Sequence, residues 1–421
     1  MSAPSHPAIF MALEPVSTTP SHAPPAAPHA RRRPPRAGRG RRRAAVLGVL
    51  AGLIAAAMSA LPAPGIPHGD WSAGRGMEGC GAVAYRYRAS PLHRWLMGDG
   101  YRDVWAETIC IPIVNLRGGF TPLRAGGGRQ TRSLRMRGAD GREYVFRSLD
   151  KDQAKALGPL PRLLMGRIRQ DQVSALHPGA SLVAAGLQDA AGVLNPAPRL
   201  EVMPTRPWLS EAYAPDFGMM AGTVQPYPRR GFAGAERVVD TDSLWAELRR
   251  APGDRVDTRA YLVARLMDVY MGDWDRHEGQ LRWARLRRGG EGSWTVIPRD
   301  RDYAFSDYGG VIPGLARRVD PKIVRFDTAY RDLRGLLVKS RELDARLLCG
   351  VSAAAWDSTA ATLARVLDDD AIAAAVGRMP PQWIRRSPTL EPTLRARRDR
   401  LPAAARRFRQ HLHADGGCAP R

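Results

Sequence analysis

Lysine is scarce in this chain of 421 residues, although the chain is strongly basic overall. Only four of the 64 basic residues are lysine, the rest are arginine, and the formal net charge is +23. With the many Ala, Gly and Pro residues, this skew indicates GC-rich coding. Arginine is spread along the chain without an RNA- or DNA-binding motif, which argues against a nucleic-acid partner. Attraction to phosphate groups or anionic lipid is still expected at this charge.

Cysteine is also scarce, with only Cys80, Cys110, Cys349 and Cys418. None of these residues has the CxxC spacing of a structural zinc site, so such a site is not expected. In an exported chain, four cysteines allow three pairings. Two readings stay open: pairing of sequence neighbours, Cys80 with Cys110 and Cys349 with Cys418, or buried free thiols.

The N-terminal region has the pattern of an export or anchoring segment. Residues 1–43 are rich in Pro, Ala, His, Ser and then Arg, and should be disordered. The uncharged run Ala44–Ala60 follows, so residues 44–62 are interpreted as a signal peptide or a transmembrane helix; a buried soluble helix is the alternative. The positive-inside rule then places the main domain in the periplasm, either anchored in a bacterial inner membrane or released.

Three short strands and two glycine-rich turns are predicted in the next part of the chain. The strands are Phe120–Leu123, Thr131–Arg137 and Glu143–Ser148, and Gly138–Gly141 has the composition of a hairpin turn. Between the first two strands lies Gly-Gly-Gly-Arg-Gln, residues 126–130. Glycines here would let backbone N–H groups approach phosphate oxygens, although a plain linker is the alternative.

The rest of the chain is predicted to be mainly helical. Helix Thr258–Met271 has the clearest ends, with Asp257 as N-cap and Gly272 just after its last residue. A short strand, Leu200–Met203, precedes a possible hinge at Pro204–Pro207. The other predicted helices are Pro161–Leu176, Leu182–Leu194, Val239–Arg249, Phe326–Val338, Ser340–Leu348, Ala353–Leu367, Asp370–Val376 and Leu390–His413.

Two acidic clusters stand out between Met271 and Phe305. Asp273 and Asp275 form the first cluster, Asp300 and Asp302 form the second, and a segment of hairpin length joins them. A divalent cation with a phosphate ligand needs several oxygen ligands of this kind. The alternative is that these aspartates are solvated turn residues.

The residues around these clusters resemble known kinases. The segment Asp275–Gln280, DRHEGQ, is similar to the DRHxxN catalytic loop of phosphoinositide 3-/4-kinases and to the DRH segment of secreted casein kinases. Asp300 stands where those families carry their metal-binding Asp. The chain also resembles a bacterial family of uncharacterised kinase-like domains, some of them fused to outer-membrane surface-antigen barrels. The shared runs lie within Pro91–Trp105, Gly118–Leu134, Glu143–Asp152 and Gly272–Trp283.

The resemblance implies a role for each candidate residue, with ATP and Mg²⁺ as cofactors. In the catalytic loop, Asp275 would be the base or would position the acceptor hydroxyl, and His277 would brace that loop, with a proton carrier as the alternative. Asp300 would hold the metal, Gln280 would stand at the metal-ligand Asn of the loop, and Asp302 and Asp273 would support these ligands. The nucleotide-binding residues would be Gly126, Gly127, Gly128, Arg129, Arg147 and Asp171, the last as acidic partner of Arg147. Arg147 in place of Lys and Gln280 in place of Asn depart from the family pattern.

The implied fold is α+β, a two-lobed atypical protein- or lipid-kinase-like domain. Its expected parts are a linker at 63–84, a small β-rich N-lobe at 85–206, a helical C-lobe at 207–415 and a tail at 416–421. The implied function is a kinase-like phosphotransferase of the cell envelope, acting on a protein or lipid acceptor. A membrane-anchored pseudokinase and a metal-dependent phosphohydrolase are the alternatives.

Overall fold

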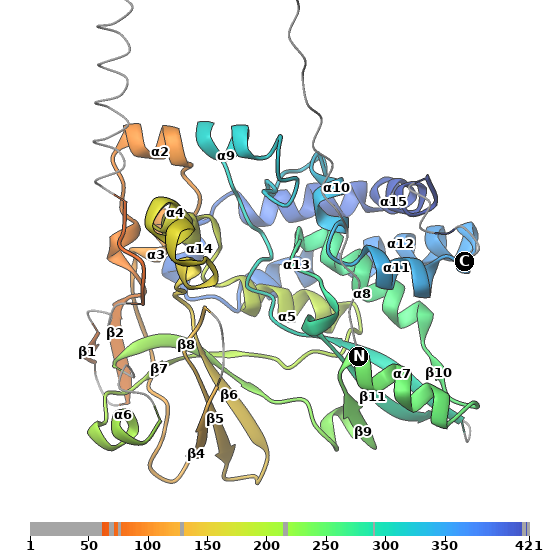
Figure 1. Cartoon of the computed structure of the whole chain (residues 1–421), viewed down its shortest axis with the longest axis horizontal. Helices are drawn as coiled ribbons and strands as arrows, with labels where there is room; N and C mark the ends of the chain where they lie inside the picture. Colours follow the sequence, from red (N-terminus) through yellow and green to blue (C-terminus); the bar gives the residue numbers. More distant parts are fainter. Residues whose placement is uncertain are drawn as a thin grey trace, which may run out of the picture. The chain divides into compact units, whose positions relative to one another are not determined.

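The computed structural model describes residues 61–66, 71–74, 77–126, 130–213, 218–288, 291–414 and 418 (Figure 1). The chain divides into two units, residues 1–53 and 54–421, and all described residues belong to the second. The expected disordered tail and the apolar run Ala44–Ala60 lie outside the described residues. Within the described part, no helix combines the length and the apolar character needed to cross a bilayer.

A five-stranded antiparallel sheet contains the three strands predicted around the glycine loop. In sheet order its strands are β4 (Phe120–Ala125), β5 (Ser133–Gly138), β6 (Glu143–Ser148), β8 (Met220–Pro226) and β7 (Arg199–Met203). The turn between β5 and β6 is the predicted hairpin, closed by the Gly141 N–H donating to the Gly138 carbonyl at 2.9 Å. Strand β8 pairs with both β6 and β7, so the expected N-lobe boundary at residue 206 falls inside the sheet.

One face of this sheet has a small apolar core of its own. Leu134 and Met136 alternate along β5, as expected for a strand with one buried face, and both are fully buried. Helix α6 (Pro207–Tyr213) adds Leu209 to the same core. The remaining buried members are Val114, Phe146, Met203, Met220 and Val224.

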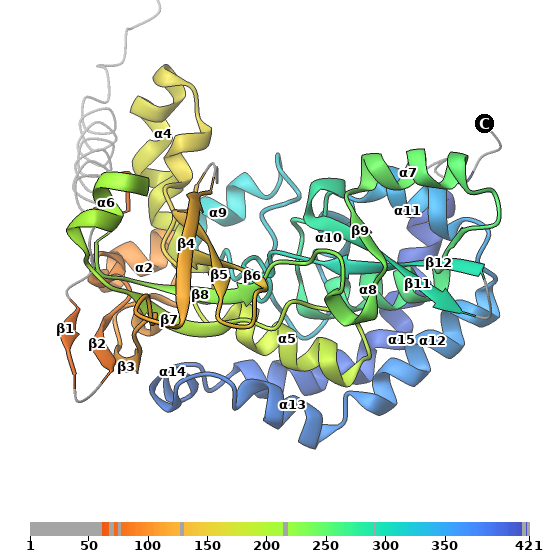
Figure 2. The same ribbon diagram turned by 90° about the horizontal axis from the view of Figure 1, so that it is seen from below.

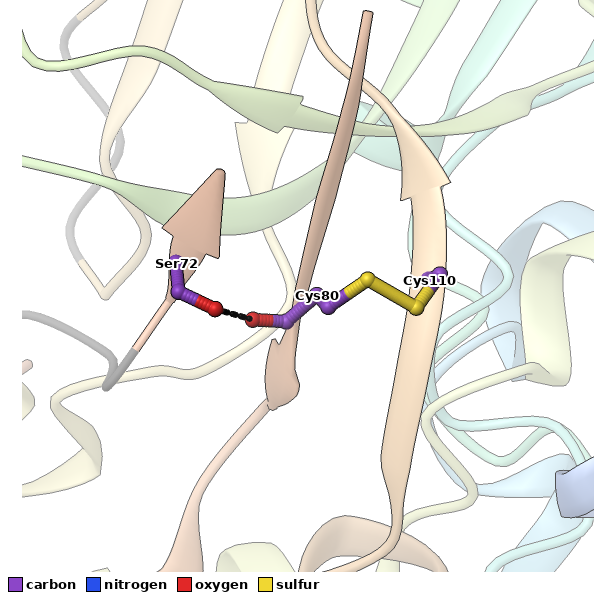
Figure 3. The surroundings of a disulfide bond; sticks show 3 residues. All are labelled: Ser72, Cys80 and Cys110. Atoms are coloured by element: carbon purple, nitrogen blue, oxygen red, sulfur yellow. Dashed lines mark hydrogen bonds between the residues drawn. A yellow bond between two sulfur atoms is a disulfide. The ribbon is translucent and has the colours of Figure 1, made fainter. Parts of the chain in front are cut away.

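A second, three-stranded sheet holds one of two disulfides. Its order is β1 (Ser72–Ala73), β2 (Glu78–Ala82) and β3 (Thr108–Pro112), which places Pro112 at the end of an edge strand. Cys80 and Cys110 face each other across β2 and β3 and form a disulfide (Figure 3). The second disulfide joins Cys349 to Cys418. The pairing of sequence neighbours is therefore confirmed.

A third sheet connects the two acidic clusters. Strands β11 (Leu281–Arg288) and β12 (Glu291–Pro298) form an antiparallel hairpin, flanked by β9 (Arg237–Val239) and β10 (Arg255–Val256). Because Leu281 pairs with Pro298, the loops at the two open ends of the hairpin lie next to each other. The two acidic clusters, about 25 residues apart in the sequence, are therefore close together in space, as the hairpin-length connection predicted.

Helix α8 (Thr258–Met271) positions the first acidic cluster. The Asp257 side chain caps it by accepting a hydrogen bond from the Ala260 N–H at 2.8 Å. Gly272 ends it with φ of 69°, a left-handed conformation suited to glycine, and the Phe326 ring would lie 2.9 Å from a Cβ at this position. The acidic loop therefore starts from a rigid, buried helix, as the sequence predicted.

The larger apolar core is built by side chains of most of the helices together with those of β11 and β12. Figures 1 and 2 show the ribbons of these elements. The predicted helix Phe326–Val338 is reduced to α10 (Leu333–Leu337), since Tyr330 has a positive φ of 53° that a helix cannot contain. Three short helices, α6, α9 (Val311–Ala316) and α14 (Pro381–Arg386), were not predicted. The others are α2 (Pro91–Met97), α3 (Arg102–Trp105), α4 (Pro159–Asp171), α5 (Ala180–Ala190), α7 (Thr241–Arg250), α11 (Arg341–Leu348), α12 (Ala353–Val366), α13 (Asp369–Val376) and α15 (Leu390–Ala414).

Candidate functional site

A small cavity lies where the five-stranded sheet, helix α5 and the second acidic loop meet. Its volume is about 50 Å³, enough for a few water molecules. Strands β6 and β8 contribute Arg147 and Thr223, and α5 contributes Ser181. The acidic loop contributes Asp300 and Asp302. Candidate residues far apart in the sequence therefore line one space.

Arg147 and Asp300 form an ion pair across this cavity. Nη1 of Arg147 lies 2.5 Å from Oδ1 of Asp300. Burial acts to raise the pKa of Asp300, but the nearby Arg147 and Arg299 outweigh it and hold that pKa below its usual value. Asp300 also has a left-handed φ of 49°, so the loop is held in a conformation that few residues adopt without support. The resemblance implied separate roles for Arg147 and Asp300, and in the structure these two residues are in direct contact.

Lys151 is a second cation of the cavity, and it was not among the predicted site residues. It follows β6, is almost fully buried, and its ammonium forms an ion pair with Asp302. The same ammonium lies 4.2 Å from the centre of the Tyr303 ring. A buried lysine needs such partners, because a desolvated charge without them is costly.

Asp275 is held by a third cation, Lys339, from the segment between α10 and α11. The Lys339 ammonium donates to Oδ1 of Asp275 and lies 4.7 Å from the centre of the Trp274 ring. Lys339 was not predicted either. A signal was available, since Lys151 and Lys339 are two of only four lysines in the chain.

A buried arginine network ties the two acidic loops together. Arg276 donates to Oδ2 of Asp273 at 2.7 Å and to the carbonyl oxygen of Arg299 at 2.6 Å. Arg301, from the second loop, forms an ion pair with Asp268 of helix α8. Burial raises the pKa of Asp273, against the opposing effect of Arg276 and Arg301. Asp273 is thus a buried structural residue that supports the loop.

His277 and Gln280 shape the end of the first loop. Nδ1 of His277 accepts a hydrogen bond from the Gly279 N–H at 3.2 Å, which supports a bracing role. Partial burial lowers the pKa of His277, although Asp275 acts in the opposite direction. The Gln280 carbonyl accepts from the Arg299 N–H at 2.9 Å, so Gln280 lies beside the start of the second loop.

Asp171 has a different role from the one predicted. Its carboxylate is fully buried and accepts two hydrogen bonds from Arg102, at 2.9 and 2.7 Å, and one from His93 at 3.0 Å. Burial acts to raise the pKa of Asp171, but His93 and Arg102 outweigh it and lower that pKa. The prediction that Asp171 pairs with Arg147 is therefore wrong. Sequence spacing could not reveal Arg102, which lies 69 residues earlier.

The glycine loop is described only at its two ends. At Gly126 the N–H donates to the Ser133 carbonyl at 2.7 Å, and a Cβ would lie 1.9 Å from the Ser133 Oγ, which explains the glycine. At the other end, Gln130 accepts a hydrogen bond from the Tyr303 hydroxyl at 3.5 Å. Residues 127–129, predicted to cover phosphates, lie outside the described residues.

The carboxylates fit a metal carried by a nucleotide better than a metal held by protein alone. Among the described residues, no group of three His, Cys, Asp or Glu side chains gathers closely enough to hold a metal ion. Mg²⁺ often needs only one or two carboxylates when phosphates supply other ligands. Oδ1 of Asp300 has the Arg147 contact but no hydrogen-bond partner of good geometry, so it suits this role.

Comparisons with solved structures include two kinases among the matches. No protein-family model matches the chain, and no curated protein sequence matches it. The chain is similar to the Helicobacter pylori proinflammatory kinase CtkA, with 11% identity over 72% of this chain and 99% of that chain, at a TM-score of 0.35. It is also similar to a golgi casein kinase, with 11% identity over 72% of this chain and 75% of that chain, at a TM-score of 0.39. Such TM-scores do not by themselves establish a shared mechanism.

Proposed function

We propose that this chain is a kinase-like phosphotransferase of the bacterial cell envelope that uses ATP and Mg²⁺. The contact between Arg147 and Asp300 is the main support for this proposal. It joins a cation on the third strand of a glycine-loop sheet to the carboxylate that follows β12. Phosphoryl transfer needs a cation at the phosphates and a carboxylate at the metal within one small space.

The side chains of the site would divide the chemistry between them. Arg147 and Lys151 would bind the nucleotide phosphates, and Asp300, supported by Asp302 and Gln280, would hold the metal. Bound Mg²⁺ would neutralise charge on the transferred phosphoryl group. Asp275 would orient the hydroxyl group of a protein or lipid acceptor and accept its proton.

Nucleotide binding in this proposal exchanges one set of ion pairs for another. In the structure, Asp300, Asp302 and Asp275 contact Arg147, Lys151 and Lys339, respectively. Phosphates would take over the first two cations and release both carboxylates toward the metal. The cavity of about 50 Å³ must also widen, because small-molecule sites generally measure about 300–1,000 Å³.

Thermal unfolding of the full-length chain with and without ATP and Mg²⁺ tests the nucleotide site. Saturating ATP with Mg²⁺ should raise the free energy of unfolding by about 2.7 kcal/mol at 100 times the Kd, and chelation of the metal should reverse much of this gain. Asp300→Ala and the closer mimic Asp300→Asn should both remove the ATP-dependent shift. Asp320→Asn, at a half-buried carboxylate outside the cavity that pairs with Lys322, is the control and should keep it. Absence of stabilisation by ATP, ADP and GTP would contradict the proposal.

A binding module without catalysis is the second candidate function. Arg147 and Gln280 favour it, because they stand where the resembled kinases have Lys and Asn. Such a pseudokinase would bind nucleotide but neither transfer nor hydrolyse the terminal phosphate. Incubation with radiolabelled ATP, followed by measurement of phosphate release and of label on protein and lipid, distinguishes the two candidates.

A further inference from the structure

A second and larger pocket lies away from the cavity at Asp300. Its volume is about 450 Å³, within the range of small-molecule sites. Helices α10, α11 and α15 and the segment that follows α9 surround it. Arginines from three of these elements line it, together with apolar side chains of α10 and α15. The pocket therefore combines positive charge with an apolar wall.

Acidic side chains balance only part of the charge of this pocket, in which Arg317 pairs with Asp332 at 3.3 Å. Arg318 and Arg334 are exposed, and neither has an acidic partner in the part of the chain that the structure describes. The acidic lining residue, Asp344, is bound to residues outside the pocket. Its carboxylate accepts hydrogen bonds from Arg265 and from the Tyr261 hydroxyl, both at 2.8 Å. The excess charge is therefore available to an anion.

The wall of the pocket also has apolar side chains, which an inorganic ion would not contact favourably. Phe408 and Leu412 of α15 are almost fully buried in the protein, and Leu337 of α10 is half-buried beside them. Val338, at the rim, has 43% of its surface exposed. A phosphate ion would satisfy the arginines but would leave the accessible apolar surface of Leu337 and Val338 in water. An apolar group on the same ligand would cover it and gain free energy in proportion to the buried area.

We propose that this pocket binds a small amphipathic anion. A phosphate, sulfate or carboxylate head would contact Arg318 and Arg334, and a short alkyl or aryl part would pack against Leu337 and Val338. The pocket also adjoins the proposed active site through the chain itself. Val338 and Arg341 line it, and Lys339, between them, contacts Asp275. An occupant therefore rests on the segment that positions Lys339.

Calorimetric titration of the full-length chain with hexyl phosphate tests the proposal. Hexyl phosphate should bind at least about tenfold more tightly than inorganic phosphate or the neutral hexyl glucoside, a difference of roughly 1.4 kcal/mol. The double variant Arg318→Gln/Arg334→Gln should weaken hexyl phosphate binding by at least a further factor of about ten. Val338→Ser should weaken hexyl phosphate and leave inorganic phosphate unchanged.

Two control variants separate this pocket from other anion sites. Arg259→Gln removes an exposed arginine of α8 that does not line the pocket, and it should leave binding unchanged. Arg147→Gln should also leave the binding of hexyl phosphate unchanged. Loss of binding in this variant would show that hexyl phosphate binds at the nucleotide site instead. No binding of hexyl phosphate, equal affinity for inorganic phosphate, or indifference to the double variant would each overturn the proposal. None of these outcomes depends on whether the chain binds ATP.

Discussion

At the scale of single residues, the aspartates of this protein contact two kinds of cation. Asp171 is held by Arg102 through two parallel hydrogen bonds inside the core. Asp275 and Asp302 are held instead by the ammonium groups of Lys339 and Lys151. A guanidinium fork fixes a carboxylate in one geometry, whereas an ammonium on a flexible stem can exchange partners. Asp275 and Asp302 should therefore change partners more easily than Asp171.

Replacement of Lys339 by methionine tests this contact. The Asp275 side chain is only 12% exposed, so it would lose its cation in a poorly solvated position. We expect Lys339→Met to lower the free energy of unfolding by about 1–3 kcal/mol in urea denaturation. Lys322→Met, at a more exposed pair with Asp320, should cost less than about 1 kcal/mol. Equal losses in both variants would show that Lys339 does not stabilise Asp275.

At the scale of secondary structure, the sequence was most informative where an element carries its own signals. Helix α8 has the predicted bounds because Asp257 and Gly272 cap it locally. Strand β8 was missed because its residues, Met-Ala-Gly-Thr-Val-Gln-Pro, have little strand character. Its strand conformation depends on pairing with β6 and β7, which are distant in sequence.

In the candidate site, too, contacts set by local sequence could be predicted, and contacts between distant segments could not. The meeting of the two acidic loops could be predicted, because a hairpin of local sequence, β11 and β12, joins them. The contact between Lys339 and Asp275 could not, since 64 residues separate them and helices α10 and α11 must first pack. The mistaken role of Asp171 has the same cause, because its partner Arg102 comes from a distant helix, α3.

His177 links two elements through a proton-sensitive contact. It precedes α5, accepts a hydrogen bond at Nδ1 from the Gly179 N–H at 2.9 Å, and contacts the Ser387 hydroxyl just after α14 through Nε2, also at 2.9 Å. Burial lowers the pKa of His177 to about 3. The neutral imidazole, with its proton on Nε2, fits both contacts.

Acidification should therefore weaken the fold through His177. The unfolded chain takes up this proton near pH 6.5, but the folded chain resists it down to about pH 3. The stabilising contribution is complete above pH 6.5, and falls by about 1.4 kcal/mol per pH unit as the pH drops through this window. Chemical denaturation between pH 7 and 4 should show a shallower pH dependence in His177→Gln than in the parent or in His413→Gln, at an exposed position of α15. An unchanged slope in His177→Gln would contradict this assignment.

At the scale of the whole molecule, the two disulfides bear on where the protein works. The disulfide Cys80–Cys110 joins β2 to β3 in the three-stranded sheet. The disulfide Cys349–Cys418 joins the end of α11 to the chain beyond α15, 69 residues later. Such bonds persist in oxidising compartments and are rare in a reducing cytoplasm. They support the proposal that the described part of the chain lies in the periplasm, where ATP is scarce. A kinase-like function in the periplasm would then depend above all on a supply of nucleotide to that compartment.

Reporter fusions test this location directly. If residues 44–62 direct export, alkaline phosphatase fused after Arg421 should be active, because it folds only where disulfides form. A β-galactosidase fusion at the same position should be inactive. Deletion of residues 44–62 should exchange the two results, since the basic flank alone does not cross a membrane. Trapping of free thiols should also find Cys349 and Cys418 oxidised in the parent and reduced in the deletion variant. An active β-galactosidase fusion of the parent chain would place the domain in the cytoplasm, where the disulfides would need another explanation but ATP would be abundant.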